Sequence, residues 1–215
     1  MKIKTLLVLS VTAFCFAAAP ALVIPTPHTA HAAEKPGQKE AKELVEQLGT
    51  EAVELLANDT ISAAEQREAF DKLISRDFNM KLIGRFVLGK HWRKATKDQQ
   101  VEYQALFKRY IISTYQKRIG EYSGENLKII RAKPLNKKEF LVLSQIIRPS
   151  GPPIKLDWRV RKGKKNGQKI VDIIVENVSM AITHRDEFSS VISQNGGQVE
   201  GLLARLRKQI ASAEK

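Results

Sequence analysis

The sequence contains almost no cysteine. Only one of its 215 residues is a cysteine. That residue, Cys15, lies inside an N-terminal apolar run that we expect to be removed, so the mature chain contains none. No disulfide bond can then stabilise it, and its stability must come from a packed core. Residues 33–215 are enough to form one domain with a sizeable core.

The sequence also lacks the common catalytic and metal-binding motifs. It has no Gly-rich phosphate loop, no His-Glu-x-x-His and no Gly-x-Ser-x-Gly. After loss of the N-terminal run only His91 and His184 remain, and a zinc site would need further ligands beside them. We therefore expect no catalytic site, no metal and no cofactor, so that the protein is not an enzyme.

Two polar groupings could suggest catalysis, and both have a simpler explanation. His184-Arg185-Asp186 is expected at the start of a helix, where the dipole favours Asp186 and Glu187 in the first turn, and no nucleophile is evident beside it. Asp172 and Glu176 lie an even number of residues apart on an expected strand. They would therefore share one face, the one in contact with water.

The N-terminus has the pattern of a signal peptide over residues 1–32. Lys2 and Lys4 precede an almost wholly apolar run from Thr5 to Ile24, and Ala30-His31-Ala32 supplies the small residues that a signal peptidase reads. Cleavage after Ala32 would place the mature protein in the periplasm. Because the run is about 20 residues long, enough to span a bilayer, an uncleaved membrane anchor is the alternative.

The charge is strongly positive. The chain has 36 Lys and Arg against 23 Asp and Glu, a formal charge of +13. Removal of residues 1–32 takes away two lysines and no acid, which leaves +11. Outside the cytoplasm such an excess favours transient contact with anionic lipid headgroups or acidic proteins, and not with nucleic acid. A role in solubility alone is the simpler alternative.

Helical periodicity dominates residues 38–122. Apolar residues at helical spacing predict helices over 39–58, from Ser62 onward, over Phe78 to Gly89, and about Lys97 to Tyr122. Gly49 is expected to weaken or break the first of them. Ser62 with Glu65, and Thr96 with Gln99, have the spacing of capping boxes that begin helices.

Alternation with a period of two follows over residues 126–182. Ile154 to Arg161 alternates apolar and charged residues, which is typical of a strand with one buried face. Three more strands are expected over Leu127–Ala132, Glu139–Arg148 and Lys169–Val178. Asn166-Gly167 predicts a hairpin turn. Two helices, about 185–194 and 198–210, complete the chain.

This order of elements predicts an α+β fold. About four antiparallel strands would be covered on one face by helices, with an N-terminal helical cluster and two C-terminal helices within 185–211. The face that carries Lys155, Asp157, Arg159 and Arg161 would contact water. Periodicity alone does not distinguish a filled core from a ligand cavity behind the other face.

Three segments resemble one known family. Leu88 to Thr96, Gly151 to Trp158 and Val171 to Phe188 occur in the order found in the periplasmic phospholipid-binding proteins of the MlaC, or toluene-tolerance, family, which includes hopanoid-associated relatives. The likeness covers about 38–208. Asn177 replaces the usual glycine, but asparagine tolerates the left-handed backbone. Gly167-Gln168-Lys169 lacks a tryptophan often found there.

The resemblance implies a carrier that hides phospholipid acyl chains between sheet and helices. Its partners would be an inner-membrane ABC lipid-transport complex and an outer-membrane lipoprotein/porin complex, with the lipid as cargo. Three alternatives stay open: a carrier of hopanoid or another lipid, a basic protein-docking module without a cavity, and a small hydrolase with an unrecognised site.

If the cavity exists, its lining is expected to consist of apolar side chains that face inward from the helices and the sheet. These are Phe78, Leu82, Phe86, Trp92, Phe107, Tyr110, Ile111, Tyr115, Leu141, Leu143, Leu156, Trp158, Val160, Ile173, Val175, Met180 and Phe188.

Overall fold

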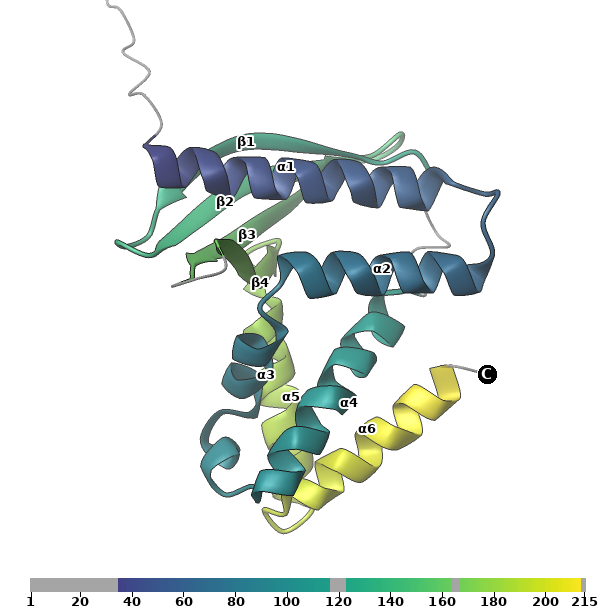
Figure 1. Cartoon of the computed structure of the whole chain (residues 1–215), viewed down its shortest axis with the longest axis vertical. Helices are drawn as coiled ribbons and strands as arrows, with labels where there is room; N and C mark the ends of the chain where they lie inside the picture. The colour runs from purple at the N-terminus through teal and green to yellow at the C-terminus, as the bar shows by residue number, and fades with distance from the viewer. Residues whose placement is uncertain (1–34, 117–122, 164–166, 214–215) are drawn as a thin grey trace, which may run out of the picture. The chain divides into compact units, whose positions relative to one another are not determined.

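The computed structural model describes residues 35–116, 123–163 and 167–213, which belong to one compact unit, Glu34–Lys215. The predicted signal peptide, the end of the predicted long helix (117–122) and Asn166 of the predicted turn lie outside the described residues. Within the described part, helices precede a sheet and two more helices follow it, as Figure 1 shows. The predicted α+β fold is confirmed.

The sheet is an antiparallel meander in the order β1-β2-β3-β4-β5. Its strands are β1 (Asn126–Pro134), β2 (Glu139–Ile147), β3 (Ile154–Lys162), β4 (Gln168–Val175) and the short β5 (Val178–Ser179). The first four match the predicted strands. The fifth was not predicted, because Lys169–Val178 was interpreted as one continuous strand.

A two-residue turn separates β4 from β5. Glu176 and Asn177 have φ of 45° and 67°, as a type I′ turn requires at both central positions. The expectation that Asn177 tolerates the left-handed backbone is confirmed. Glu176 lies in this turn, not on a strand beside Asp172, so the predicted shared face of the two carboxylates is wrong.

The helix after the sheet, α5 (Met180–Gln194), begins five residues earlier than predicted. Ser179 is its N-cap, and the Ser179 hydroxyl accepts a hydrogen bond from the backbone N–H of Ile182 at 3.1 Å. Asp186 and Glu187 therefore lie beyond the first turn, and the predicted role of these two carboxylates at the start of the helix is wrong.

The helices form two groups. The first, α1 (Pro36–Ala57) and α2 (Ala63–Asp77), packs against the sheet through a cluster that includes Val45, Leu73 and Trp158. The second group forms a separate helical core. It consists of α3 (Met80–Leu88), the 3₁₀ helix η1 (Gly89–Arg93), α4 (Lys97–Gln116), α5 and α6 (Val199–Ala213). The described residues thus form two hydrophobic clusters.

Local signals in the sequence fix several of these helix ends. The predicted capping boxes form at both positions: Ser62 with Glu65 at the start of α2, and Thr96 with Gln99 before α4. Gly49, in contrast, does not break α1. A Cβ atom at this position would lie 2.5 Å from the Leu127 side chain, so glycine here permits close approach of α1 to β1.

The sheet face opposite α1 and α2 is only partly in contact with water. Arg159 and Arg161 are exposed as predicted, but Asp157 is buried. Its carboxylate accepts a hydrogen bond from the backbone N–H of Ser144 at 3.4 Å and lies 3.5 Å from the Lys155 ammonium. The prediction that Asp157 contacts water is therefore wrong, because a strand pattern does not show which neighbouring groups cover a carboxylate.

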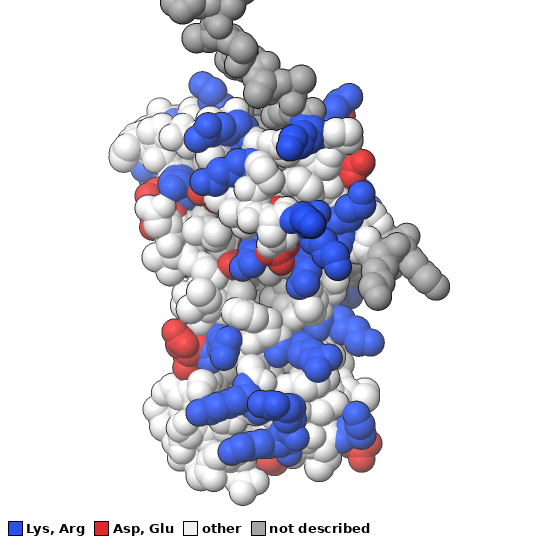
Figure 2. Space-filling view, turned by 90° about the vertical axis from the view of Figure 1, so that its left-hand side faces the viewer, with Lys and Arg blue, Asp and Glu red and all other residues white. Residues whose placement is uncertain are grey.

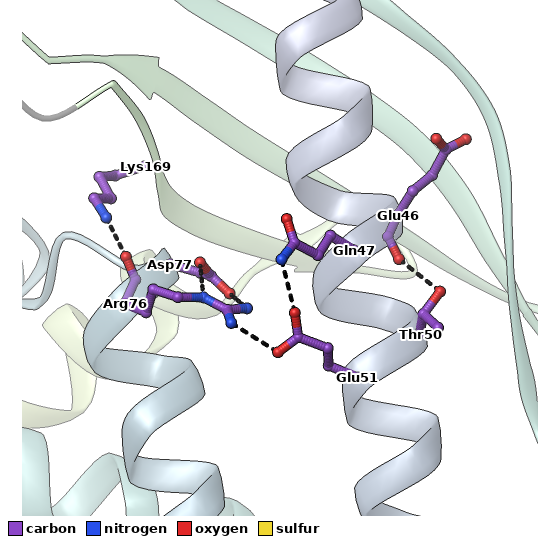
Figure 3. A network of polar contacts seen from close by, with 7 residues as sticks. All are labelled: Glu46, Gln47, Thr50, Glu51, Arg76, Asp77 and Lys169. Carbon is purple, nitrogen blue, oxygen red and sulfur yellow. Dashed lines mark hydrogen bonds and ion pairs between the residues drawn. The ribbon is translucent and has the colours of Figure 1, made fainter.

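A polar network joins α1, α2 and β4 at the edge of the sheet (Figure 3). The Arg76 guanidinium donates to both oxygens of the buried Asp77, at 2.9 and 2.7 Å, and to Glu51 on α1 at 2.7 Å. Lys169 on β4 donates to the Arg76 carbonyl. Hydrogen bonds from Arg76 and Gln47 lower the pKa of Glu51.

Replacing Arg76 with glutamine is expected to lower the free energy of unfolding by about 1–2 kcal/mol. The buried Asp77 would lose its charged donor, and the partial exposure of Arg76 moderates that loss. Urea unfolding at pH 7 measures the effect. Lys72→Gln is the matched control, because the Lys72–Glu68 pair is exposed on both sides and should contribute about 0.5 kcal/mol or less. Equal effects of the two substitutions would contradict this role of Arg76.

Candidate functional site

An apolar pocket of about 430 Å³ lies where the two hydrophobic clusters meet. Helices α1 to α5 contribute to its walls, together with β2, β3 and β4. The lining residues are Leu48, Ala52, Phe70, Leu73, Ile74, Phe78, Met80, Ile83, Phe107, Ile111, Tyr115, Ile146, Ile154, Leu156, Trp158, Asp172, Ile173, Val175, Met180, Ala181 and His184.

The sheet side of the apolar pocket is built by alternate residues of paired strands. Trp158 pairs with Ile173 and Leu156 with Val175, so these four side chains share the face toward the helices. The indole N–H of Trp158 donates to the Ser144 hydroxyl at 3.0 Å, and that hydroxyl donates to the Leu156 carbonyl. The polar atom of the indole is therefore satisfied within the sheet, and its ring is left to line the pocket.

Few polar side chains line the pocket, and the structure engages them in local contacts. The Asp172 carboxylate accepts hydrogen bonds from the Ser179 hydroxyl at 2.5 Å and from the backbone N–H of Ala181 at 3.0 Å. Asp172 is thus buried and stabilises the start of α5, contrary to the predicted wet position. The Tyr115 hydroxyl lies 3.3 Å from Nε2 of His184.

His184 is a titratable residue of the pocket lining. Burial lowers its pKa below the usual value of 6.5, and the carboxylate of Glu187, 3.7 Å from Nδ1, acts in the opposite direction. The rings of Tyr110, Tyr115 and Phe188 surround the imidazole. The folded protein therefore favours the neutral imidazole.

The stability of the protein is expected to fall as the pH is lowered from 7 to 5. The unfolded chain takes up a proton on His184 near pH 6.5, whereas the folded chain resists it, so the unfolded state binds more protons in this window. One such group can contribute at most about 1.4 kcal/mol per pH unit. Glu51 and Glu139, whose pKa values are lowered below 4.5, act only at lower pH.

Urea unfolding of the wild type and of His184→Gln at pH 7, 6 and 5 measures this contribution. The variant should lose less stability between pH 7 and 5. Some pH dependence will remain, because burial also lowers the pKa of His91. Parallel curves for the two proteins would contradict a neutral, buried His184.

The structure brings nine of the seventeen predicted lining residues to the apolar pocket. They come from the end of α2, α4, the two central strands and α5: Phe78, Phe107, Ile111, Tyr115, Leu156, Trp158, Ile173, Val175 and Met180. Whether these residues bind a ligand stays a prediction.

The other eight predicted residues do not line this pocket. Tyr110 and Phe188 are buried in the helical core, with Trp92 partly buried against it. Val160 is buried between the sheet and α1. Phe86 is 41% exposed, and the Arg185 guanidinium lies 5.1 Å above its ring.

Leu141 and Leu143 lie on the opposite face of the sheet. They pair with Arg159 and Asp157, whereas Val142 pairs with Trp158 on the helix side. The prediction that the two leucines face the helices is therefore wrong, because the neighbouring residues on the strand, such as Val142, face that way. Leu82, the last of the eight, lines a neighbouring pocket.

The residues that the prediction missed come mostly from α1, α2 and the outer ends of strands. They are Leu48, Ala52, Phe70, Leu73, Ile74, Met80, Ile83, Ile146, Ile154 and Ala181, with the polar Asp172 and His184. For α2 a signal was available, since Phe70, Leu73 and Ile74 form the apolar stripe of a predicted helix. Small residues such as Ala52 gave no signal.

The structure belongs to a class of architecture in which helices pack on one face of a meander sheet and leave an apolar pocket between helices and sheet. Within this class, the family model for the MlaC protein matches residues 46–208. The chain belongs to the MlaC family.

Two curated relatives are similar in sequence. An intermembrane phospholipid transport system binding protein MlaC from Haemophilus influenzae is 25% identical over 60% of this chain and 61% of its own length. A toluene tolerance protein, ttg2D, from Pseudomonas putida is 23% identical over 59% of this chain and 58% of its own. The matched region spans about three fifths of each relative.

One solved structure is similar in fold. It is a phospholipid-binding protein from Ralstonia solanacearum in complex with a phospholipid. The match has a TM-score of 0.71 and 24% sequence identity, and it covers 81% of this chain and 99% of that one. In the described part of the present chain, no helix has the length and apolar character needed to span a bilayer.

Proposed function

We propose that this protein is a periplasmic lipid carrier. It would hold the acyl chains of a phospholipid in the apolar pocket and shuttle the lipid between an outer-membrane lipoprotein/porin complex and an inner-membrane ABC transport complex. The pocket, lined by apolar side chains from both hydrophobic clusters, is the observation that carries the proposal. The names of its relatives support the same class of cargo.

The energetics of acyl chains suit this role. Each buried CH₂ contributes about 0.8 kcal/mol, so two chains of about 30 methylenes in total would gain of order 20 kcal/mol over exposure to water. A bilayer offers the same gain. Exchange between membrane and protein can therefore be nearly neutral, and the partner complexes would set its direction.

The pocket supports binding and not chemistry. Its polar side chains serve the fold: Asp172 binds the start of α5, and His184 contacts Tyr115. No bound metal or cofactor is required by this role, and the phospholipid is cargo. A protein of this kind needs no catalytic site, in keeping with relatives that are named for binding and transport.

The organisation of the chain follows from the same proposal. Residues 1–32 would be removed as a signal peptide after Ala32, and residues 33–215 would act as one lipid-binding domain. The excess of Lys and Arg would assist transient contact with membranes and partner complexes.

Native mass spectrometry of the exported protein, followed by organic extraction, tests the proposal. A stoichiometric adduct whose fragments are those of a phospholipid is expected, on a chain whose intact mass corresponds to residues 33–215. Fragments of a hopanoid would show that the protein carries a hopanoid instead of a phospholipid. A repeatedly lipid-free mass from membrane-containing cells would contradict it and would favour the basic docking module instead.

A further inference from the structure

A second pocket, of about 790 Å³, adjoins the apolar pocket. We call it the basic pocket. Its walls come from the end of α2, the first turn of α3, α4, the end of β3 and the start of β4, and consist of Ser75, Phe78, Asn79, Met80, Lys81, Leu82, Lys108, Arg161, Lys162, Gly163 and Lys169. The linings of the two pockets have Phe78 and Met80 in common, and these residues therefore lie at the boundary between the pockets.

The charge of the basic pocket has one sign. Five of its lining residues are cationic, and none of the described lining residues carries a carboxylate. Lys108 pairs with Asp71 at 2.6 Å and Arg161 with Glu139 at 3.5 Å, both from outside the lining. Lys169 donates to the carbonyl of Arg76, which is not charged.

The surroundings add to this positive potential. Figure 2 shows the face that carries α3, where Lys and Arg side chains gather and Asp and Glu are few. Lys81 and Lys162 are both exposed to water on the rim of the basic pocket. An anion in this pocket would gain attraction from several cations without the cost of burying a charge.

We propose that the basic pocket binds the phosphate of the lipid whose acyl chains occupy the apolar pocket. This inference rests on the proposed carrier function and adds a headgroup site to it. A phosphate next to Phe78 and Met80 would place the glycerol backbone at the boundary between the two pockets. Methionine is the most adaptable apolar side chain, so Met80 can move aside for the connecting chain.

A competition between two lipids that differ only in the phosphate tests the proposal. Lipid-free protein is incubated with vesicles that contain phosphatidic acid and diacylglycerol with the same acyl chains in equal amounts, and native mass spectrometry gives the loading ratio. Lysine near an anionic lipid contributes about 1 kcal/mol, so the wild type should favour phosphatidic acid by roughly tenfold or more. In Lys81→Gln/Lys162→Gln the ratio should fall toward one.

The matched control is Lys133→Gln/Lys137→Gln, which removes two exposed lysines outside the basic pocket and should keep the wild-type ratio. Thermal unfolding of both double variants checks that they are folded. A wild-type ratio near one, or a Lys81/Lys162 variant with the wild-type ratio, would overturn the headgroup site and leave the carrier function intact. Failure of the wild type to load either lipid would instead overturn the carrier function.

Inorganic phosphate distinguishes a lipid headgroup from a free anion. At constant ionic strength and with each lipid offered alone, added phosphate should lower the loading of phosphatidic acid and leave that of diacylglycerol unchanged, because only the former needs the basic pocket. Saturable phosphate binding to the wild type that leaves the lipid ratio unchanged would show an independent anion site and would overturn the proposal.

Discussion

Ala52→Trp is expected to reduce lipid loading by at least about tenfold. Ala52 lines the apolar pocket from α1, so an indole at this position would take up space that acyl chains need. Exclusion of only two methylenes costs about 1.6 kcal/mol, which already corresponds to more than tenfold in affinity. The measurement is the fraction of loaded protein in native mass spectra after incubation with phospholipid vesicles.

The control for this substitution is available on the same helix. Ala57, the last residue of α1, is exposed and does not line the apolar pocket, so Ala57→Trp adds the same indole without filling it. Its loading should match that of the wild type. Thermal unfolding of lipid-free Ala52→Trp should show a folded protein, since the indole enters existing space. Normal loading of folded Ala52→Trp would mean that acyl chains bind elsewhere.

The limits of prediction from the sequence are clearest in β2. Residues 140–143 and 146–147 are apolar at both odd and even positions, so alternation does not show which set faces the helices. We predicted that Leu141 and Leu143 face the helices. The pairing of Val142 with Trp158 decides the question, and that register depends on the turn before β3 and on contacts with α1. In β3 the alternation is strict, and its inward face was predicted correctly.

The start of α5 shows a second limit. Asn177 signals a left-handed residue, but Glu176 does not, and its φ of 45° is unusual for its type. The sequence therefore predicts one continuous strand as far as Val178. Capping boxes at Ser62 and Thr96 were recognisable because both partners lie within one turn. Local signals were sufficient for the starts of α2 and α4, whereas the type I′ turn before α5, with a glutamate at a left-handed position, was not recognisable.

The third limit concerns which apolar residues line a pocket. Aromatic residues on α4 and α5 divide between two environments: Tyr115 lines the apolar pocket, while Tyr110 and Phe188 fill the helical core. A helical stripe predicts burial but not the partner against which a residue packs. Helix α6 packs on α4 and α5, and its buried residues belong to the same helical core as Tyr110 and Phe188.

Phe188→Ala is expected to lower the free energy of unfolding by about 3–5 kcal/mol. Phe188 is 2% exposed in the helical core, and its ring contacts those of Tyr103, Phe107 and Tyr110 with centroids 6.3, 6.2 and 5.6 Å away. Removal of a fully buried aromatic side chain leaves a cavity among these rings. Phe86→Ala, at a ring that is 41% exposed, should cost about 1 kcal/mol or less. Urea unfolding at pH 7 compares the two.

A second substitution at Phe188 tests whether this residue belongs to the helical core or to the lipid pocket. Phe188→Leu keeps most of the apolar volume and should lower the free energy of unfolding by only roughly 1–2 kcal/mol, so this variant is expected to stay folded. Because Phe188 does not line the apolar pocket, folded Phe188→Leu should load phospholipid as the wild type does. A loss of loading comparable to that of Ala52→Trp, without a loss of stability, would place Phe188 at the lipid and restore the interpretation drawn from the sequence.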